Sequence, residues 1–362
     1  MIPLPYYTAV FNHTLLAIVL LTVGALAFLR EESLPQGVFK TSFWALLLAV
    51  IFYMGLRPIS GIYFGDMGTY ARDFERARFA LGTLELNRSD SLFLLFLELS
   101  AAFLSVDTWF LLCAALYVGL MAWAVHRVHG PQAYLALLVM VASYSFWGYG
   151  VNGIRNGLAT SLVLLGMAYR DRKAIMFVLF GLALGTHASV ALPVSIFLLG
   201  FVIRSPWFYL IGYALAIPLS LIMGGWWESW FASLGLFGDA RFSSYLLDTT
   251  EARLFSATGF RWDFVLYSLS PILFAAWQLF RRRLEDPFYT QLVNTYVGCN
   301  AFWVLVIRAS YSNRFAYLSW FLMPWVFIYP LLADKVLPGR YRLIGVFLLT
   351  YYLFTYFMVV KS

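Results

Sequence analysis

Residues 132–169 read QAYLALLVMVASYSFWGYGVNGIRNGLATSLVLLGMAY, which is two long apolar runs joined by Val151-Asn-Gly-Ile-Arg-Asn-Gly157. The apolar runs predict membrane helices, and the polar joint places an arginine between two asparagines at the mouth of one of them. A charged side chain at membrane depth costs roughly 2.5–3.5 kcal/mol and usually marks a substrate path or site. This stretch therefore predicts both a membrane fold and a candidate site.

The composition excludes a soluble globule. The mean hydropathy is +0.77 and 12% of residues are charged, whereas soluble domains carry about a quarter. The net charge of +7 indicates no nucleic-acid partner, because basic residues of membrane proteins mostly hold cytoplasmic loops in place. Cys113 and Cys299 both lie in apolar runs, so no disulfide framework is expected.

The apolar runs predict an all-α polytopic bundle of about twelve spans, forming a single integral membrane domain over residues 1–362. A span needs about 20 apolar residues. The predicted spans are 6–29, 41–56, 107–125, 132–149, 152–169, 174–186, 188–203, 206–223, 262–280, 288–307, 315–333 and 341–360.

Basic loops orient these spans. The short loops at 170–173, 281–283 and 335–342 are rich in Lys and Arg, so we expect them to be cytoplasmic. A thirteenth apolar run, 91–106, carries Glu98 at its centre, which favours a helix lying in the interface. With that run uncrossed, loops 57–106 and 224–261 and both termini are external; if it crosses, loop 57–106 and the N-terminus become cytoplasmic.

Two external loops are predicted to hold juxtamembrane helices. Residues 68–84 interleave aromatic and charged side chains, which is typical of an amphipathic helix on a membrane surface. Loop 224–261 contains Trp226, Trp227 and Trp230, which suit the headgroup layer. Its residues 241–254 are expected to form a second surface helix carrying Arg241 and Tyr245.

The polar joint is the first candidate site. Asn152, Arg155, Asn156 and Thr160 follow spacings of three and four, so we expect them to share one helix face, where they could bind an anion. Gly153 and Gly157 form a G-x-x-x-G pair that would let another helix approach closely. The alternative is an arginine that snorkels to the interface and caps helix ends.

Asp66 lies in a glycine-containing turn just outside a span. Its carboxylate could take a proton from a sugar hydroxyl, bind a divalent cation, pair with Arg57, or cap the following helix. His187 lies in a polar break, where it could act as a base or phosphate partner or simply connect two helices. No cofactor is predicted; a divalent metal is possible, although no motif indicates one.

Arginine makes up most of the positive charge, and only four of the 25 cations are lysine. The guanidinium fork suits diphosphate oxygens, although genomic codon bias gives the same composition. Arg308 and Arg314 enclose a short loop that contains no acidic residue, so at least one of them is expected to bind substrate.

These residues resemble the EpsG family of exopolysaccharide polymerase-like membrane proteins, which are related in role to the Wzy polymerases. The resemblance spreads over residues 57–333 and rests on short elements in the family's order: Gly65-Asp66 with Tyr70, Asn152-Gly-Ile-Arg155, Thr186-His187-Ala-Ser189, and Arg314. Met67 stands where the family often has an aromatic residue, and Asn156 where it often has glutamine. These departures put the substrate in question.

The resemblance implies a lipid-linked glycosyltransferase in the bacterial inner (cytoplasmic) membrane, working at the periplasmic or extracellular face in exopolysaccharide, capsule or O-antigen synthesis. It implies the joining of oligosaccharide units carried on undecaprenyl diphosphate, with membrane lipid and other polysaccharide-assembly proteins as further partners. We expect Arg155 and Arg314, with Arg241, to hold the diphosphate. Asp66 or His187 would act as the base, and Arg57 would orient Asp66.

The substrate-binding set is completed by Asn152, Asn156, Tyr245, Arg308 and Tyr70. Three other functions stay open from the sequence. A transporter or flippase of lipid-linked sugars would need polar groups throughout the bilayer depth. A membrane O-acyltransferase would use His187 without needing so many arginines. A ligase that transfers finished polymer would use nearly the same chemistry as a polymerase.

Overall fold

The computed structural model of the chain describes residues 2–28, 36–79, 90–233, 259–309, 312–333 and 339–360. All regular structure within these ranges is helical, which confirms the all-α prediction. Seven helical segments there are long and apolar enough to cross a membrane: Leu4–Phe28, Gln36–Gly55, Val106–Val141, Pro206–Phe231, Trp262–Arg281, Ser312–Ala333 and Arg340–Val360. The polytopic character is therefore confirmed, with fewer full-length segments than the twelve runs counted in the sequence.

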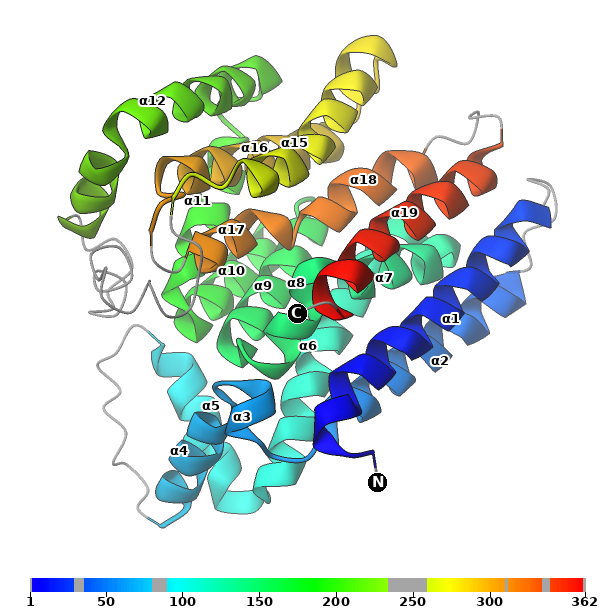
Figure 1. The fold of residues 1–362 in the computed structure, drawn as a ribbon, viewed down its shortest axis with the longest axis vertical. Helices are drawn as coiled ribbons and strands as arrows, with labels where there is room; N and C mark the ends of the chain where they lie inside the picture. The colour runs from blue at the N-terminus through cyan, green and yellow to red at the C-terminus, as the bar shows by residue number, and fades with distance from the viewer. Residues whose placement is uncertain are drawn as a thin grey trace. The chain divides into compact units, whose positions relative to one another are not determined.

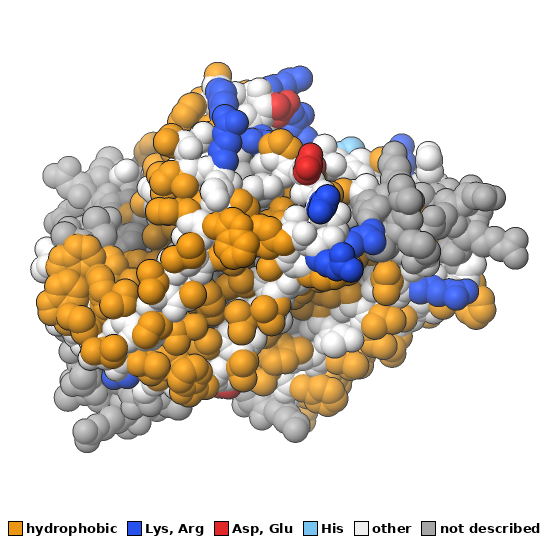
Figure 2. Space-filling view, turned by 90° about the horizontal axis from the view of Figure 1, so that it is seen from above, with side chains coloured by type: hydrophobic (Ala, Val, Ile, Leu, Met, Phe, Trp, Pro, Cys, Tyr) orange, Lys and Arg blue, Asp and Glu red, His pale blue; other side chains and the backbone are white. Residues whose placement is uncertain are grey.

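The difference arises from short helices that lie between the long ones. Four apolar helices have 10–17 residues, and a helix of 15 residues is only about 22 Å long, less than the roughly 30 Å hydrocarbon core. The predicted span 288–307 is α16 (Pro287–Leu305), whose Gln291, Asn294 and Asn300 are buried inside the protein. Figure 2 shows hydrophobic side chains over much of one face, as expected where lipid covers a membrane protein.

The chain groups into two compact units, and each is described by itself. Unit 1 comprises residues 1–86, 90–186 and 331–362. Its principal helices are α1 (Tyr7–Phe28), α2 (Gln36–Gly55), α3 (Gly61–Phe64), α4 (Met67–Phe79), α5 (Ser91–Phe103), α6 (Val106–His129), α7 (Ala133–Val141), α8 (Tyr144–Val151), α9 (Ile154–Ala168), α10 (Lys173–Thr186) and α19 (Arg340–Val360).

Helix α6 is the centre of packing in unit 1, and it lies against both α2 and α9 (Figure 1). Small residues allow these approaches. A Cβ on Gly55 would come within 2.7 Å of Leu111 on α6. One on Gly157 would come within 3.2 Å of the Tyr117 ring on α6 and within 2.7 Å of the Tyr149 carbonyl oxygen on α8. Gly157 therefore allows the close approach that the G-x-x-x-G spacing predicted. Helix α1 lies beside α19.

Helix α9 is anchored at its C-terminal end by α6. Arg127 donates through Nε to the Ala168 carbonyl at 2.9 Å and pairs through Nη2 with Asp171 at 2.7 Å. A cation at the end of a helix is favoured by the helix dipole. The Arg127 guanidinium holds the pKa of Asp171 below its usual range. This end of α9 therefore has the charge that a helix terminus prefers.

Helices α4 and α5 occupy the predicted juxtamembrane region. In α4, Met67, Tyr70, Phe74 and Ala77 are buried, which gives one apolar face at helical spacing and confirms an amphipathic helix. The predicted interval 68–84 extends beyond it, since residues 80–84 lie outside the described part. In α5, Glu98 is buried within the protein. This burial is compatible with two positions of α5, one covered by neighbouring helices and one in the membrane interface.

Unit 2 comprises residues 187–330 with 87–89. Its helices are α11 (Ala191–Leu199), α12 (Pro206–Ser233), α15 (Trp262–Ala276), α16, α17 (Ser312–Trp320) and most of α18 (Met323–Ala333), with α12 beside α16. Helix α12 is kinked at Met223 and continues to Ser233. The first ten residues of the predicted loop 224–261 are therefore helical.

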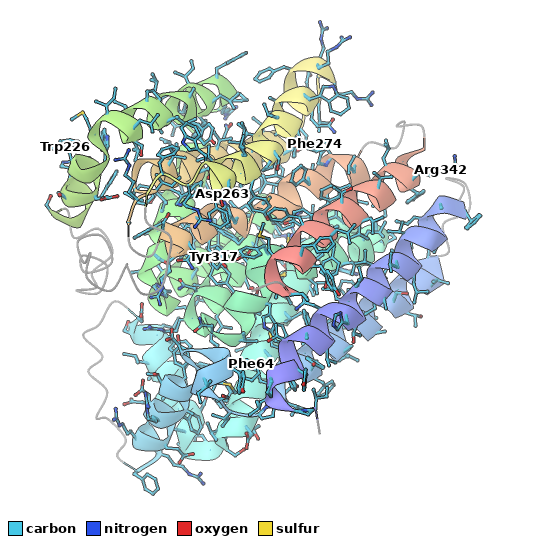
Figure 3. The ribbon with its side chains drawn as sticks, viewed as in Figure 1. Phe64, Trp226, Asp263, Phe274, Tyr317 and Arg342 are labelled. Atoms are coloured by element: carbon cyan, nitrogen blue, oxygen red, sulfur yellow. The ribbon has the colours of Figure 1, made fainter. Side chains whose placement is uncertain are left out.

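Trp226, labelled in Figure 3, and Trp230 are exposed on α12, and their rings are stacked with centroids 5.8 Å apart. Their side chains are 50% and 40% exposed, which fits the predicted position in a headgroup layer. The predicted surface helix at 241–254 lies outside the described residues.

Candidate functional site

The turn that contains Gly65 and Asp66 docks on Asn152, 86 residues along the chain. The backbone N–H of Asp66 donates to Asn152 Oδ1 at 2.8 Å. Gly65 has a φ of +54°, and a Cβ at this position would collide with the Asn152 amide. Glycine is required on both counts, since other residues rarely adopt this backbone conformation. Two stretches of the predicted site therefore meet directly.

Asn152 is placed by a break between two helices and not by a helix face. Helix α8 ends at Val151, and α9 begins at Ile154 with Gly153 at its N-cap. The sequence predicted one face shared by Asn152, Arg155, Asn156 and Thr160. The structure instead puts Asn152 in the joint, where its side chain can turn toward another segment.

Arg57 contacts both of the segments that meet at this docking point. It is 3% exposed and donates to the backbone carbonyls of Met54 and, at 3.1 Å, Val151. Its guanidinium lies 5.7 Å from the ring centroid of Phe64, which is labelled in Figure 3. Burial lowers the pKa of Arg57 to about 10, so the side chain remains a cation at neutral pH.

Arg57 and Asp66 form no ion pair in the described part of the chain. The expected orienting contact is replaced by an indirect one, because Arg57 touches Val151 and Phe64, the residues that precede Asn152 and Gly65. It also satisfies a carbonyl in the last turn of α2, as basic residues near helix C-termini commonly do. The sequence prediction named such a capping role only as an alternative for Arg155.

Arg155 lies in the first turn of α9 and joins three helices. Its Nη1 pairs with the Asp90 carboxylate, at the N-cap position of α5. Its Nε donates to the hydroxyl of Tyr70 on α4 at 3.2 Å. The Arg155 side chain is 22% exposed and that of Asp90 is 5% exposed. The arginine is thus half-buried and fixed at two points.

Asp90 was missed as a site residue by the sequence prediction, which named no acidic partner for Arg155. A signal was present, because Asp90 stands immediately before the apolar run 91–106, where an N-cap carboxylate is expected. What the sequence did not contain was the packing of α5 that brings this N-terminus to α9. An arginine in a first turn is opposed by the helix dipole, and Asp90 supplies the missing negative charge.

Tyr70 connects Arg155 to Asp66. Its ring is buried beside Phe93 and Trp109, at centroid distances of 5.8 and 6.5 Å. Burial raises the pKa of Tyr70, and the neighbouring Arg155 opposes that rise. The Asp66 charge is close enough to raise it further. The hydroxyl is therefore a neutral group held between a cation and a carboxylate.

The Asp66 carboxylate is exposed and accepts no hydrogen bond from the described residues. Asp66 does begin α4, because its backbone carbonyl accepts from the N–H groups of Thr69 and Tyr70 at 3.0 Å each. The helix start is thus made by the backbone, and the carboxylate remains open to solvent. This is the geometry that a base or ligand-binding carboxylate needs.

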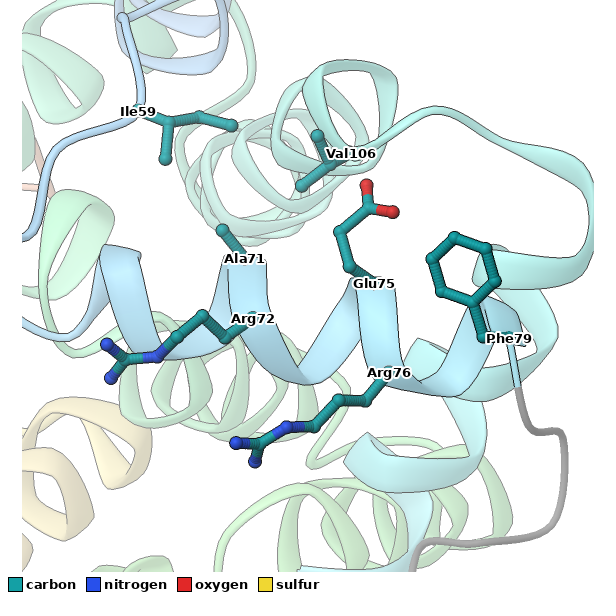
Figure 4. A pocket seen from close by; sticks show the side chains of 7 residues that line it. All are labelled: Ile59, Ala71, Arg72, Glu75, Arg76, Phe79 and Val106. Atoms are coloured by element: carbon teal, nitrogen blue, oxygen red, sulfur yellow. The ribbon is translucent and has the colours of Figure 1, made fainter.

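The opposite face of α4 borders a surface pocket of about 780 Å³ (Figure 4). Ile59, Ala71, Phe79 and Val106 supply most of its walls, Arg72 and Arg76 lie at its edge, and Glu75 also lines it. This face combines apolar walls with charges of both signs.

The remaining predicted residues, apart from Asn156, belong to unit 2 or to undescribed parts of the chain. His187 accepts through Nδ1 from the Ser189 N–H at 3.2 Å, at the start of a short helical turn, which is the helix-connecting role left open for it. Arg308 donates to the Leu221 carbonyl at 3.3 Å, beside the kink of α12. Arg314 lies exposed in the first turn of α17. Arg241 and Tyr245 lie outside the described residues.

Asn156 adjoins Arg155 in the first turn of α9 and is half-buried. Of the predicted set, the structure thus brings together Arg57, Asp66, Tyr70, Asn152 and Arg155 within unit 1, with Asp90 added. We call these six residues the unit 1 cluster. Within the described ranges, no group of three or more His, Cys, Asp or Glu residues is placed to hold a metal ion.

Comparison with known proteins identifies a family. The model of the EpsG family matches residues 40–362, which include the whole unit 1 cluster. No curated protein and no solved structure matches the chain. Because the match covers most of the sequence, this membrane protein belongs to the EpsG family.

Proposed function

We propose that this protein is a polysaccharide polymerase, a membrane glycosyltransferase that joins oligosaccharide units carried on undecaprenyl diphosphate at the periplasmic or extracellular face. The observation that carries the proposal is the unit 1 cluster, in which an open carboxylate, a neutral hydroxyl and a fixed guanidinium lie together. The family match supports a polysaccharide polymerase role in general.

The reaction needs one group for each developing charge. The acceptor hydroxyl attacks the anomeric carbon, the bond from that carbon to the diphosphate breaks, and the lipid diphosphate leaves with the bonding electrons. Asp66 takes the hydroxyl proton, since an exposed carboxylate is free to approach it. Arg155 stabilises the negative charge on the leaving diphosphate, an effect that is largest where donors are fixed in advance. Arg314 is proposed as a second cation for the diphosphate, and His187 as the alternative base.

The lipid part of the donor requires an apolar surface near the cluster. The pocket on the outer face of α4 has apolar walls, which suit a prenyl chain, and it is also lined by Arg72, Glu75 and Arg76. Tyr70 presents a hydroxyl to the sugar end. This arrangement supports a donor that approaches from the membrane along α4.

The proposal is tested by complementing a deletion strain with Asp66→Asn and Arg155→Lys variants. Removal of the base should reduce polymer formation by about 10²–10⁴-fold, and the lysine variant should shorten the polymer. Asp73→Asn and Arg78→Lys are matched controls, because both residues lie on α4 outside the unit 1 cluster and outside the lining of the pocket. The measurements are chain length on gels and protein amount in the membrane.

Normal chain length from both site variants at normal protein levels would overturn the proposal. Accumulation of single units outside the membrane would support polymerisation. Accumulation on the cytoplasmic side would point instead to a transporter, and an unchanged chain length with altered acylation would point to an O-acyltransferase.

A further inference from the structure

We propose that Asp90 is a positioning residue for Arg155. Its carboxylate fixes the orientation of the Arg155 guanidinium and at the same time lowers the affinity of the site for the anionic donor. The inference rests on the proposed function, because it assumes that Arg155 meets a diphosphate. It concerns Asp90 and not the proposed base Asp66. It explains why a second carboxylate lies beside the place where an anion is proposed to bind.

Asp90 occupies a buried position that the backbone fixes. It is 4% exposed, and it stands at the N-cap position of α5, where a negative charge is stabilised by the helix terminus. Its backbone carbonyl accepts from the Leu94 N–H at 3.1 Å, so the first turn of α5 fixes its position. The carboxylate is thus held on a rigid element.

The pair with Asp90 determines where the rest of Arg155 points. A guanidinium is planar and its five N–H groups have a fixed geometry. With Nη1 on Asp90, the opposite Nε reaches the Tyr70 hydroxyl at 3.2 Å. Loss of the first contact would release rotation of the whole fork, and the second contact would weaken with it.

The same carboxylate reduces the positive charge that an anion experiences. Arg155 and Asp90 together carry no net charge, and attraction in a partly buried site is stronger than in water. Replacing Asp90 by asparagine keeps the size and one acceptor oxygen but adds one positive charge to the site. The two roles therefore predict effects of opposite sign in a single variant.

The experiment measures binding of inorganic pyrophosphate to the full-length protein in nanodiscs of zwitterionic lipid, together with polymer formation in the deletion strain. Asp90→Asn should bind pyrophosphate about tenfold more tightly and form at least fivefold less polymer per protein. Asp73→Asn makes the same charge change at a half-buried position on α4 outside the pocket lining, and both quantities should stay within about twofold of wild type.

A purely structural ion pair predicts something else, namely that both quantities fall together as the protein loses stability. That result, or unchanged pyrophosphate binding in Asp90→Asn, overturns the inference. If Asp90→Asn does not accumulate in the membrane, Asp90→Glu takes its place. It keeps the charge and shifts the contact, so pyrophosphate affinity should remain within about threefold while polymer formation falls; a parallel loss of both, or no loss of polymer, is contrary to the inference.

Failure of the proposed function gives a different pattern. If the neutral variant Arg155→Gln binds pyrophosphate as wild type does, Arg155 is not the anion site and the proposed donor site is wrong. If Arg155→Gln weakens binding while Asp90→Asn does not strengthen it, the donor site stands and the role of Asp90 is wrong.

Discussion

Arg57 and Arg155 are two arginines of unit 1 that lie at helix ends and meet opposite conditions. Arg57 follows the C-terminus of α2, where it is buried and donates to backbone carbonyls. Arg155 lies in the first turn of α9, where the dipole opposes a cation, and it is paired with Asp90 and Tyr70. The comparison teaches that an arginine satisfied by a helix C-terminus is structural. An arginine held at the unfavourable end by a buried carboxylate is a candidate for binding.

The largest expected effect on stability is at Arg57. Arg57→Met should lower the free energy of unfolding by about 2–4 kcal/mol, because the carbonyls of Met54 and Val151 lose their donor and buried polar groups without partners are costly. Thermal unfolding in detergent measures this change. A variant that is as stable as wild type but forms no polymer would break the distinction between the two arginines.

Gly65→Ala tests the docking point that both arginines support. Alanine strains the positive φ and displaces the Asn152 amide, so we expect a stability loss of about 2 kcal/mol and shorter polymer. Gly61→Ala is the control, since a Cβ at that position would meet Gly68 only at 3.7 Å. Wild-type polymer from Gly65→Ala would show that the register between the turn and Asn152 is unimportant.

Arg155→Lys sharpens the other half of the comparison. Lysine can keep the charge pair with Asp90 but lacks the planar fork that also reaches Tyr70. We expect a change in unfolding free energy below about 1 kcal/mol and roughly tenfold less polymer per protein. A large loss of stability in this variant would make Arg155 a structural residue like Arg57.

Tyr70→Phe should have the smallest effect. It removes the hydroxyl that Arg155 Nε donates to and keeps the ring beside Phe93 and Trp109. A net hydrogen bond contributes about 1 kcal/mol, so polymer formation should fall about threefold to tenfold. Unchanged polymer formation would exclude the hydroxyl from the site.

The sequence predicted the helical membrane fold, the amphipathic α4 and the importance of the joint around Arg155. Hydropathy and periodicity are local signals, so these features were accessible from it. It did not predict the counter-ion, since Asp90 lies 65 residues away in sequence and reaches Arg155 only through the packing of α5. It assigned Arg57 to Asp66 by proximity in the chain, whereas the buried side chain found two carbonyls instead.

The span count shows the same limit, and α7 explains why. All nine residues of α7, Ala133–Val141, are buried, yet a helix of that length is only about 14 Å long. Hydropathy measures how unfavourable it is for a segment to contact water. It does not distinguish a segment covered by lipid from one buried inside the protein. A lipid-soluble photoreactive probe should therefore label α1 strongly and pass over α7, although α7 is the more apolar by sequence.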